Sequence, residues 1–258
     1  MENKTVFNQI ISDYAIARPG YPSELYDDIV EFSMLKQDAE ILEIGAGPGQ
    51  ATDYFVKNGY SITALEIGNE QVRYLSDKYS GYRNFKPICS SFENYSCLSE
   101  TYNLVFSATA FHWIEPEIGY PKAYNLLKKN GTLAVFWHMY SIIREPSEMF
   151  NEICKIFQKY APELDDFISN DEAEALNRLR FSQIQTNRLF DKPDYKVYRW
   201  IDEYTTERYV ELLNSYTDIH EMDEDKRNAV LQSVAEFIES KNGKILVPQE
   251  VRLFIVRK

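Results

Sequence analysis

Cysteine is scarce in this chain of 258 residues, which has three, at Cys89, Cys97 and Cys154. Three is an odd number, and the spacing matches no metal-binding pattern, so we expect reduced thiols and no metal site. Disulfides are rare where thiols are kept reduced, and the pattern therefore favours a cytoplasmic protein.

Long apolar segments are also missing. No apolar run is long enough to span a bilayer, and the N-terminus lacks the basic-then-apolar order of a secretory leader. We therefore expect no membrane partner. Low-complexity segments and internal repeats are absent as well, and hydrophobic residues make up 44% of the chain, enough for a sizeable core.

Positive charge is the third shortage. The chain has 28 Lys and Arg against 40 Asp and Glu, so its net charge is −12 at pH 7. A surface of this sign repels nucleic acid unless a local basic patch exists, and the sequence contains none. We expect a small-molecule partner and no nucleic acid, whereas the sequence does not indicate an oligomeric state.

The most informative stretch of the chain is residues 41–50, which read ILEIGAGPGQ. Ile41, Leu42 and Ile44 form a near-continuous apolar run, which is typical of a parallel strand buried on both faces. Three glycines follow at every second position, and the apolar spacing then predicts a helix over residues 50–58. A glycine loop before a helix lets a ligand approach the free backbone N–H groups closely.

The glycine spacing separates two classes of ligand. A dinucleotide fingerprint reads G-x-G-x-x-G, whereas here the third glycine, Gly49, comes one residue early. Glu43 stands two positions before the first glycine, which gives the pattern E-x-G-x-G-x-G. The next predicted strand, residues 61–66, ends in Glu66, where a carboxylate can accept both ribose hydroxyls. A solvated glutamate at a strand end is the alternative interpretation.

Alternating strands and helices indicate a doubly wound α/β fold. Besides the two strands above, we expect strands at residues 85–88, 102–107, 132–137, 181–190 and 251–256. N-terminal helices and the cofactor-binding α/β core are expected within residues 1–138, and the remainder of the sheet within 139–258, in a single overall domain. Two inserts, residues 139–180 and 191–242, are predicted to be helical and to cap the sheet.

Four motifs together resemble the class I S-adenosylmethionine-dependent methyltransferases, in the small-molecule branch that includes trans-aconitate methyltransferase. They are the E-x-G-x-G-x-G loop, the acid after strand two, Ser-Phe-Glu after strand three and Phe-His-Trp after strand four, at residues 43–49, 66, 91–93 and 111–113. The resemblance covers residues 1–138 well and the remainder more loosely. It implies a seven-stranded, mostly parallel, Rossmann-like sheet whose seventh strand runs antiparallel beside the fifth.

The resemblance implies methyl transfer from S-adenosyl-L-methionine to a small-molecule acceptor, by O-, N- or carboxylate methylation, with S-adenosyl-L-homocysteine as the product. It also implies a set of cofactor-binding residues: Arg18, Glu43, Gly45, Ala46, Gly47, Gly49, Glu66, Ile67, Ser91, Phe92 and Ala108. A non-catalytic S-adenosylmethionine-binding module is one alternative, and a nicotinamide-dependent oxidoreductase is a less favoured one.

Methyl transfer is an in-line displacement, so the main work of such an enzyme is to hold the acceptor close and aligned. A hydroxyl or amine acceptor can need a base, whereas a carboxylate does not. His112 is the candidate base, because it follows the strand nearest the methyl group in the resembling fold, and a structural histidine is the alternative. The predicted acceptor pocket is lined by Tyr14, Tyr21, Trp113, Trp137 and His138.

Overall fold

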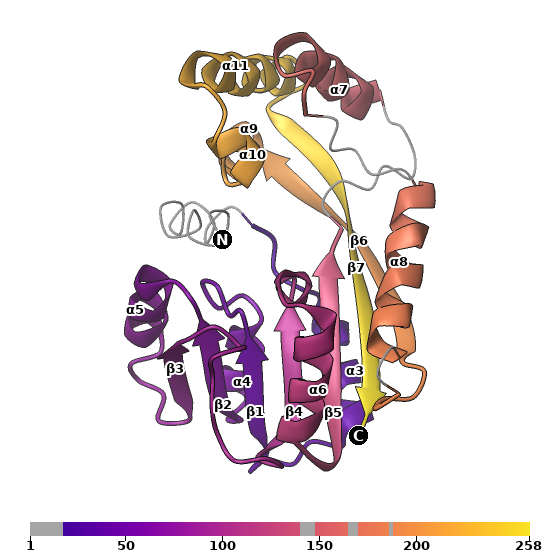
Figure 1. Cartoon of the computed structure of the whole chain (residues 1–258). Helices are drawn as coiled ribbons and strands as arrows, with labels where there is room; N and C mark the ends of the chain where they lie inside the picture. Colours follow the sequence, from indigo (N-terminus) through magenta and orange to yellow (C-terminus); the bar gives the residue numbers. More distant parts are fainter. Residues whose placement is uncertain (1–17, 140–147, 165–169, 186–187) are drawn as a thin grey trace. The chain divides into compact units, whose positions relative to one another are not determined.

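The computed structural model describes residues 18–139, 148–164, 170–185 and 188–258 (Figure 1). Tyr14 lies outside these ranges. The chain divides into two compact units, each built from several segments. Of the described residues, the larger unit contains 20–138, 176–185, 188–198 and 251–258, and the smaller unit contains 18–19, 139, 148–164, 170–175 and 199–250.

A seven-stranded sheet in the order β3-β2-β1-β4-β5-β7-β6 forms the framework. Its centre is β1 (Glu40–Ile44), which is parallel to both β2 (Ser61–Glu66) and β4 (Tyr102–Ala108). The sheet continues in parallel with β3 (Phe85–Cys89) on one side and β5 (Leu127–His138) on the other. Next to β5 runs β7 (Lys244–Arg257), which is antiparallel, and β6 (Asp194–Thr205) follows it. The predicted doubly wound, mostly parallel sheet is confirmed.

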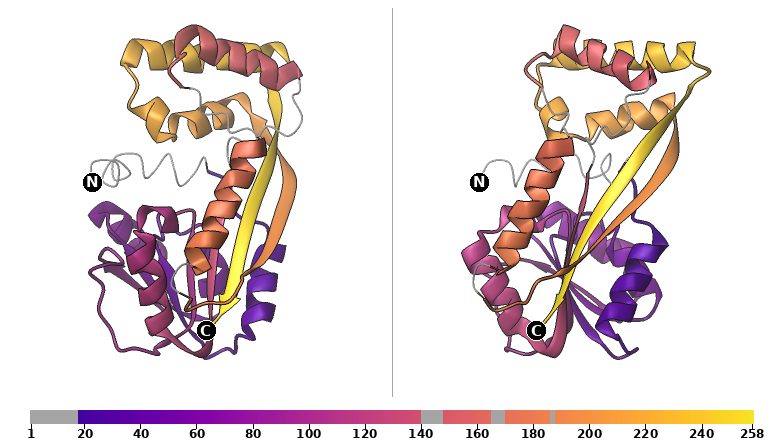
Figure 2. Two further views of the ribbon diagram at one scale, coloured as in Figure 1. Left: turned by 45° about the vertical axis from the view of Figure 1, so that its right-hand side comes forward. Right: turned by 90° about the vertical axis from the view of Figure 1, so that its right-hand side faces the viewer.

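Helices cover both faces of this sheet within the larger unit (Figure 2). On one face lie α3 (Ser23–Ser33) and α4 (Thr52–Lys57), and on the other lie α6 (Pro116–Leu126) and the 176–185 part of α8 (Asn170–Gln185). A further helix, α5 (Asn69–Lys78), packs against β2 and β3. Ile41 and Leu42 point to opposite faces of β1 and are both fully buried, which explains the near-continuous apolar sequence of this strand.

Proline, glycine and polar residues fix the ends of several helices. Pro22 precedes α3 with an extended backbone, and Pro116 occupies the first position of α6, where its missing N–H costs nothing. Gly59 follows α4 with a φ of 85°, a left-handed conformation that suits glycine. Within the described ranges, no helix has both the length and the apolar sequence needed to cross a membrane.

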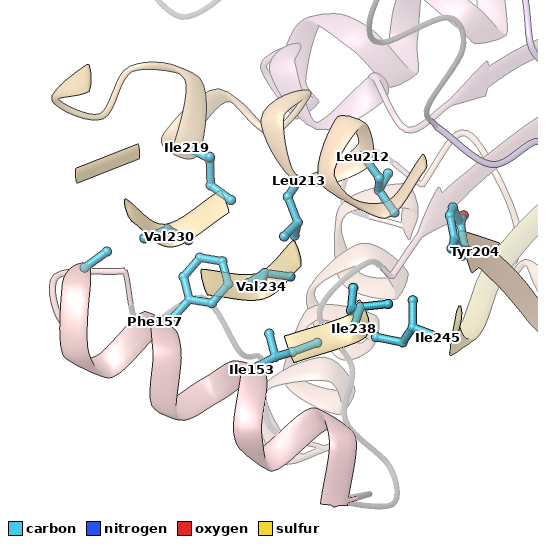
Figure 3. Close-up of a cluster of buried hydrophobic side chains, with 11 residues drawn as sticks. Ile153, Phe157, Tyr204, Leu212, Leu213, Ile219, Val230, Val234, Ile238 and Ile245 are labelled. Atoms are coloured by element: carbon cyan, nitrogen blue, oxygen red, sulfur yellow. The ribbon is translucent and has the colours of Figure 1, made fainter. Parts of the chain in front are cut away.

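The smaller unit has an apolar core of its own, formed mainly by helices (Figure 3). Its helices are α7 (Glu148–Tyr160), α9 (Thr206–Asn214), α10 (Thr217–His220) and α11 (Glu224–Ser240). Ile153 and Phe157 of α7 pack with Val234 of α11, and Tyr204 at the end of β6 joins the same cluster. The predicted helices in this part of the chain are therefore confirmed, whereas their predicted role as a cap over the sheet stays a prediction.

One predicted strand is wrong. Residues 181–190 were expected to form the sixth strand, but α8 continues to Gln185, and β6 begins at Asp194. The expected strand depended on the alternation of Ile184 and Thr186, yet the buried side chains of Ala173, Asn177 and Ile184 recur at helical spacing. The second insert, residues 191–242, is consequently not wholly helical, because it contains β6.

A short 3₁₀ helix, η1 (Phe111–Trp113), follows β4 and holds the Phe-His-Trp motif. Its position places His112 next to the carboxyl end of β5. In open α/β sheets, the carboxyl ends of the strands are where ligands bind.

Candidate functional site

The glycine loop connects β1 to α4 in a backbone conformation that needs glycine. Gly45, Gly47 and Gly49 have φ values of 71°, 53° and 85°, all in the left-handed region. The N–H groups of Gly45 and Ala46 donate to the carbonyl of Leu65 at 2.9 and 3.1 Å, which ties the loop to β2. The predicted strand, loop and helix are thus confirmed as local structure.

The three glycines serve different purposes. A Cβ atom on Gly45 would lie 2.5 Å from the Cβ of Ala110, and one on Gly49 would lie 2.6 Å from the hydroxyl of Tyr79. At those two positions glycine allows close packing of protein against protein. A Cβ on Gly47 would meet nothing within 4 Å, so the backbone at Gly47 borders open space that a ligand can fill.

The carboxylate of Glu66 binds the glycine loop directly. Its Oε2 accepts the N–H of Gly47 at 2.8 Å, and its Oε1 accepts the N–H groups of Ile67 and Gly68 at 2.7 and 3.2 Å. Two carboxylate oxygens offer about four acceptor positions, so three are occupied and room remains for a further donor. Glu66 is therefore not a solvated strand end, because it is buried and bound to backbone.

Glu43 lies beneath the loop and is almost fully buried. The hydroxyl of Thr52 donates to its Oε2 at 2.6 Å, whereas Oε1 has no hydrogen-bond partner among the described residues. Burial is the main cause that raises the pKa of Glu43 to about 8, and the charge of Glu66 adds to the shift. A buried acceptor of this kind is costly unless a donor reaches it, and a bound cation or ligand would supply one.

The loop after β3 combines a core side chain with a polar one. Phe92 is buried and its ring lies 6.4 Å from that of Phe111. Ser91 uses its carbonyl to accept the N–H groups of Asn94 and Tyr95 at 3.2 and 3.0 Å. On the neighbouring strand end, Ile67 is partly exposed and presents an apolar side chain to solvent. These are the places predicted to surround an adenine ring.

Thr109 lies just beyond Ala108, the last residue of β4, and adopts a φ of 58°, which is unusual for a β-branched residue. Its hydroxyl shares a hydrogen bond of 3.0 Å with Tyr21 and accepts the backbone N–H of His138 at 3.1 Å. This turn brings Ala110 against Gly45, so the ends of β1, β4 and β5 are fixed together.

His112, Trp137 and Arg180 form a cluster at the carboxyl ends of β4 and β5. The indole N–H of Trp137 donates to Nδ1 of His112 at 3.1 Å, and Cζ of Arg180 lies 3.9 Å from the centre of the Trp137 ring. Protein atoms around the imidazole, together with the charge of Arg180, lower the pKa of His112 to about 4. His112 is an exposed residue, and its ring lies 4.8 Å from the partly exposed ring of Trp113.

A second arginine belongs to the same region. Arg252 of β7 pairs directly opposite Trp137 of β5, so the two side chains share one face of the sheet. Arg252 is fully buried, and its charge contributes to lowering the pKa of Arg180 to about 10, after the larger effect of burial. We call these four residues, His112, Trp137, Arg180 and Arg252, the cationic cluster.

The remaining predicted site residues lie in two places. His138 is buried, and its ring lies 6.1 Å from the ring of Tyr21 in the larger unit. Arg18 belongs to the smaller unit, where its guanidinium donates to Ser215 and lies 4.0 Å over the ring of Tyr216. Within the described ranges, no group of three His, Cys, Asp or Glu side chains is placed to hold a metal ion.

Sequence reasoning missed several residues of this site. Thr52 orients Glu43. Lys78, the last residue of α5, and Tyr79, which follows it, donate to the carbonyl of Gly49 at 3.4 and 3.0 Å. Arg180 falls at the end of the first predicted insert, and Arg252 in an ordinary predicted strand. A polar residue inside the apolar strand pattern of residues 251–256 was the available signal for Arg252.

The known proteins that resemble this chain in sequence are described as methyltransferases. Residues 42–135 match the protein family described as Methyltransferase domain. A Schizosaccharomyces pombe protein, uncharacterized methyltransferase-like C25B8.10, is 25% identical over 225 residues, which cover 87% of this chain and 82% of the relative.

Two solved structures share the fold. The Bacillus YcgJ protein superposes with a TM-score of 0.55 at 15% identity, over 92% of this chain and 99% of its own. A Haemonchus contortus N-methyltransferase, solved with phosphomonomethylethanolamine and S-adenosylhomocysteine, gives the same TM-score and identity over 97% of this chain and 58% of its own.

The site also fits the cofactor of such enzymes. Open space above Gly47, a carboxylate at the end of β2 and a buried acceptor on Glu43 suit the ribose and the cationic amino-acid part of S-adenosylmethionine. The chain is a methyltransferase with a Rossmann-like fold, and its site offers the groups that S-adenosylmethionine would need as a cofactor.

Proposed function

We propose that this methyltransferase acts on a small molecule that carries an anionic oxygen group, and that the cationic cluster binds this group. The observation that carries the proposal is Arg180, whose guanidinium lies over Trp137 and next to His112 at the carboxyl ends of β4 and β5. Arg252, on the opposite residue of β7, adds a second permanent positive charge.

The placement of these charges supports an anionic ligand. Two guanidinium groups near one another in a shielded region repel, and a bound anion would offset that repulsion. Arginine also suits carboxylate and phosphate groups because its planar fork presents paired donors. The chain as a whole is strongly acidic, with a net charge of −12, so this local cluster opposes the overall charge.

The cofactor residues are proposed from the same geometry. When S-adenosylmethionine is bound, its sulfonium supplies an activated methyl group. Glu66 would accept a ribose hydroxyl with the acceptor position that its backbone donors leave free, and Glu43 would face the ammonium group. Ser91, Phe92 and Ile67 would surround the adenine. The predicted contact of Arg18 with a carboxylate stays a prediction.

Two parts of the proposed function, the methyltransferase branch and the type of acceptor, go beyond the fold. The branch that includes trans-aconitate methyltransferase is consistent with an anionic acceptor, and we retain it as a hypothesis. A small-molecule acceptor, with no nucleic acid or membrane partner, is supported by the acidity of the chain and by a cationic cluster that contains just two arginines.

The test compares acids with their uncharged analogues. The protein, saturated with S-adenosylhomocysteine, is titrated in a calorimeter with succinate, glutarate, benzoate and phenylacetate, and with the carboxamide of each. We expect at least one acid to bind roughly tenfold or more tightly than its carboxamide, a difference of about 1.4 kcal/mol. Equal binding of acids and carboxamides would contradict the anionic acceptor.

Two variants on the same helix make the test specific. Arg180→Gln removes a charge from the cationic cluster and should abolish the preference for the acid. Arg178→Gln removes the same charge from an exposed position of α8 and should keep the preference. Affinity for S-adenosylhomocysteine should stay within roughly twofold in both variants, since neither residue borders the glycine loop. Failure of the wild-type protein to bind S-adenosylhomocysteine would instead contradict the cofactor assignment.

A further inference from the structure

The hydrogen bond between Trp137 and His112 determines which imidazole nitrogen carries the proton. An indole N–H can only donate, so Nδ1 of His112 must accept, at a distance of 3.1 Å. A neutral imidazole has one N–H group and one acceptor nitrogen. With Nδ1 as the acceptor, the proton must lie on Nε2.

The surroundings of His112 keep it neutral. A second proton would have to enter at Nδ1, where it would break the bond from Trp137 and oppose the indole N–H. It would also add a positive charge beside Arg180, with Arg252 near. Among the described residues, Tyr120 of α6 and Tyr195 of β6 also act on Arg180, and both side chains are uncharged in their ordinary state. Among the described residues, no carboxylate forms a hydrogen bond with His112.

From this geometry we infer that His112 is a neutral Nε2–H hydrogen-bond donor at the acceptor site and does not remove a proton from the acceptor. The inference rests on the proposed function, which places the acceptor at the cationic cluster. His112 as a residue is exposed to solvent, so its side chain is open to a ligand. His112 then acts as a positioning residue in place of the predicted general base.

The consequence for the reaction is that the acceptor atom needs no deprotonation. A carboxylate oxygen meets this condition, because its lone pair is free at neutral pH. The new bond joins that oxygen to the methyl carbon, while the carbon–sulfur bond breaks and its electron pair stays on sulfur. The sulfonium becomes a neutral thioether, the carboxylate becomes a neutral ester, and no proton moves. The residues supply donors to the carboxylate: Nε2–H of His112 and the guanidinium of Arg180.

The first test observes the proton directly by nitrogen-15 NMR on histidine-labelled protein. The chain has three histidines, and the signal of His112 is the one missing from His112→Gln. We expect Nδ1 to be unprotonated and Nε2 protonated, with no titration between about pH 5.5 and 8, where an ordinary histidine changes charge. A proton on Nδ1, or titration near the ordinary pKa of about 6.5, would overturn the inference.

Trp137→Phe is the matched perturbation, since it removes the indole N–H and keeps an aromatic ring. In this variant we expect a mixture of both His112 tautomers and a higher pKa of the imidazole. An unchanged tautomer in Trp137→Phe would show that Trp137 does not fix it, and would overturn the argument. These spectra need neither cofactor nor acceptor, so their outcome is independent of whether the proposed function holds.

The second test separates a donor from a base by activity. The acceptor is the acid that binds most tightly in the calorimetric panel, and methyl transfer is followed with labelled S-adenosylmethionine. Glutamine keeps an N–H donor but has no basic nitrogen, so His112→Gln should lose less than roughly tenfold in kcat/KM, and His112→Ala roughly tenfold more than that. We also expect kcat/KM of the wild type to be flat between about pH 5.5 and 8.

The opposite pattern would show a base. In that case His112→Gln would be as inactive as His112→Ala, and the wild-type kcat/KM would fall with decreasing pH at the pKa that NMR assigns to His112. The chemical stability of the product provides a further readout. A methyl ester releases labelled methanol in mild alkali, whereas an N-methyl or aryl ether product does not, and retention of the label in alkali would contradict a carboxylate acceptor.

Discussion

The carboxylate of Glu66 accepts the backbone N–H of Gly47 at 2.8 Å, so the end of β2 and the middle of the glycine loop are joined by a charge-assisted hydrogen bond. This bond between two separate elements helps to fix the shape of the loop. The same carboxylate is the group proposed to accept a ribose hydroxyl, so it has a structural role and a binding role at one position.

Replacing Glu66 by alanine should therefore affect both properties. Loss of one charge-assisted hydrogen bond costs roughly 1.5–3 kcal/mol, so we expect cofactor affinity to fall by about tenfold or more. We also expect a lower free energy of unfolding, because three backbone N–H groups lose their acceptor. Calorimetry with S-adenosylhomocysteine and urea unfolding measure the two effects. Glu70→Ala, at an exposed position of α5, is the control. Cofactor affinity equal to wild type in Glu66→Ala would refute the binding role of Glu66.

Gly47→Ala should leave the fold intact but weaken cofactor binding. Its φ of 53° means that a side chain costs about 1–2 kcal/mol of stability, with no steric clash against the protein. The new methyl group would occupy the open space, so we expect cofactor affinity to drop by roughly tenfold or more. Gly59→Ala is a matched control, because Gly59 also has a left-handed φ, and a Cβ there meets only the flexible end of Gln37. Equal affinity in the two variants would show that the space above Gly47 is not used.

The buried carboxyl of Glu43 should make stability fall with rising pH. Burial raises its pKa from 4.5 to about 8, so the native state holds a proton that the unfolded chain has already lost. The stabilising contribution is fully present below about pH 4.5 and is lost as the pH rises to about 8. Glu43→Gln removes this titration, and we expect its free energy of unfolding to exceed that of the wild type by at least about 1.4 kcal/mol at high pH, the equivalent of one pKa unit.

Urea unfolding at several pH values in this window measures the effect. Glu40→Gln, at the exposed start of the same strand, should keep the pH dependence of the wild type. If Glu43→Gln instead keeps the pH dependence of the wild-type free energy of unfolding, the carboxyl of Glu43 does not cause that dependence. The raised pKa of Glu43 would then be wrong.

Thr109 should be needed for its hydroxyl more than for its methyl group. The hydroxyl links Tyr21 and the N–H of His138, and valine would keep the shape while leaving that buried N–H without an acceptor. An unsatisfied buried group costs about 1–3 kcal/mol, which is the loss of stability expected for Thr109→Val. Thr109→Ser keeps the hydroxyl and should change stability by less than about 1 kcal/mol. Similar unfolding curves for the two variants would show that the hydroxyl does not hold the turn.

The part of the site that sequence predicts is the part built from short segments. Residues 41–50 specify strand, loop and helix by local spacing, and Glu66 is found from its position at the end of the next strand. The predicted strands and helix of this region are confirmed, and Glu66 lies near the loop because parallel βα units bring the carboxyl ends of neighbouring strands together.

The cationic cluster depends on pairing between distant segments, and a charged residue within the apolar pattern of residues 251–256 is the one local sign of its arginines. Arg252 meets Trp137 because β7 is antiparallel to β5 in one particular register. Arg180 reaches Trp137 because α8 packs on that face, and Ile184 with Thr186 had suggested a strand there. Period-two and helical spacing overlap in such short apolar runs, so the register and the packing partner had to come from the structure.

The position of β7 in the sheet also affects the order in which the protein can be assembled. β7 pairs with β5 on one side and β6 on the other, yet it is synthesised after both. While the helices of the smaller unit are being translated, β5 presents an unpaired edge to other nascent chains. Exposed edges of this kind promote intermolecular pairing, so the β5 edge is open to mispairing until β7 has been made.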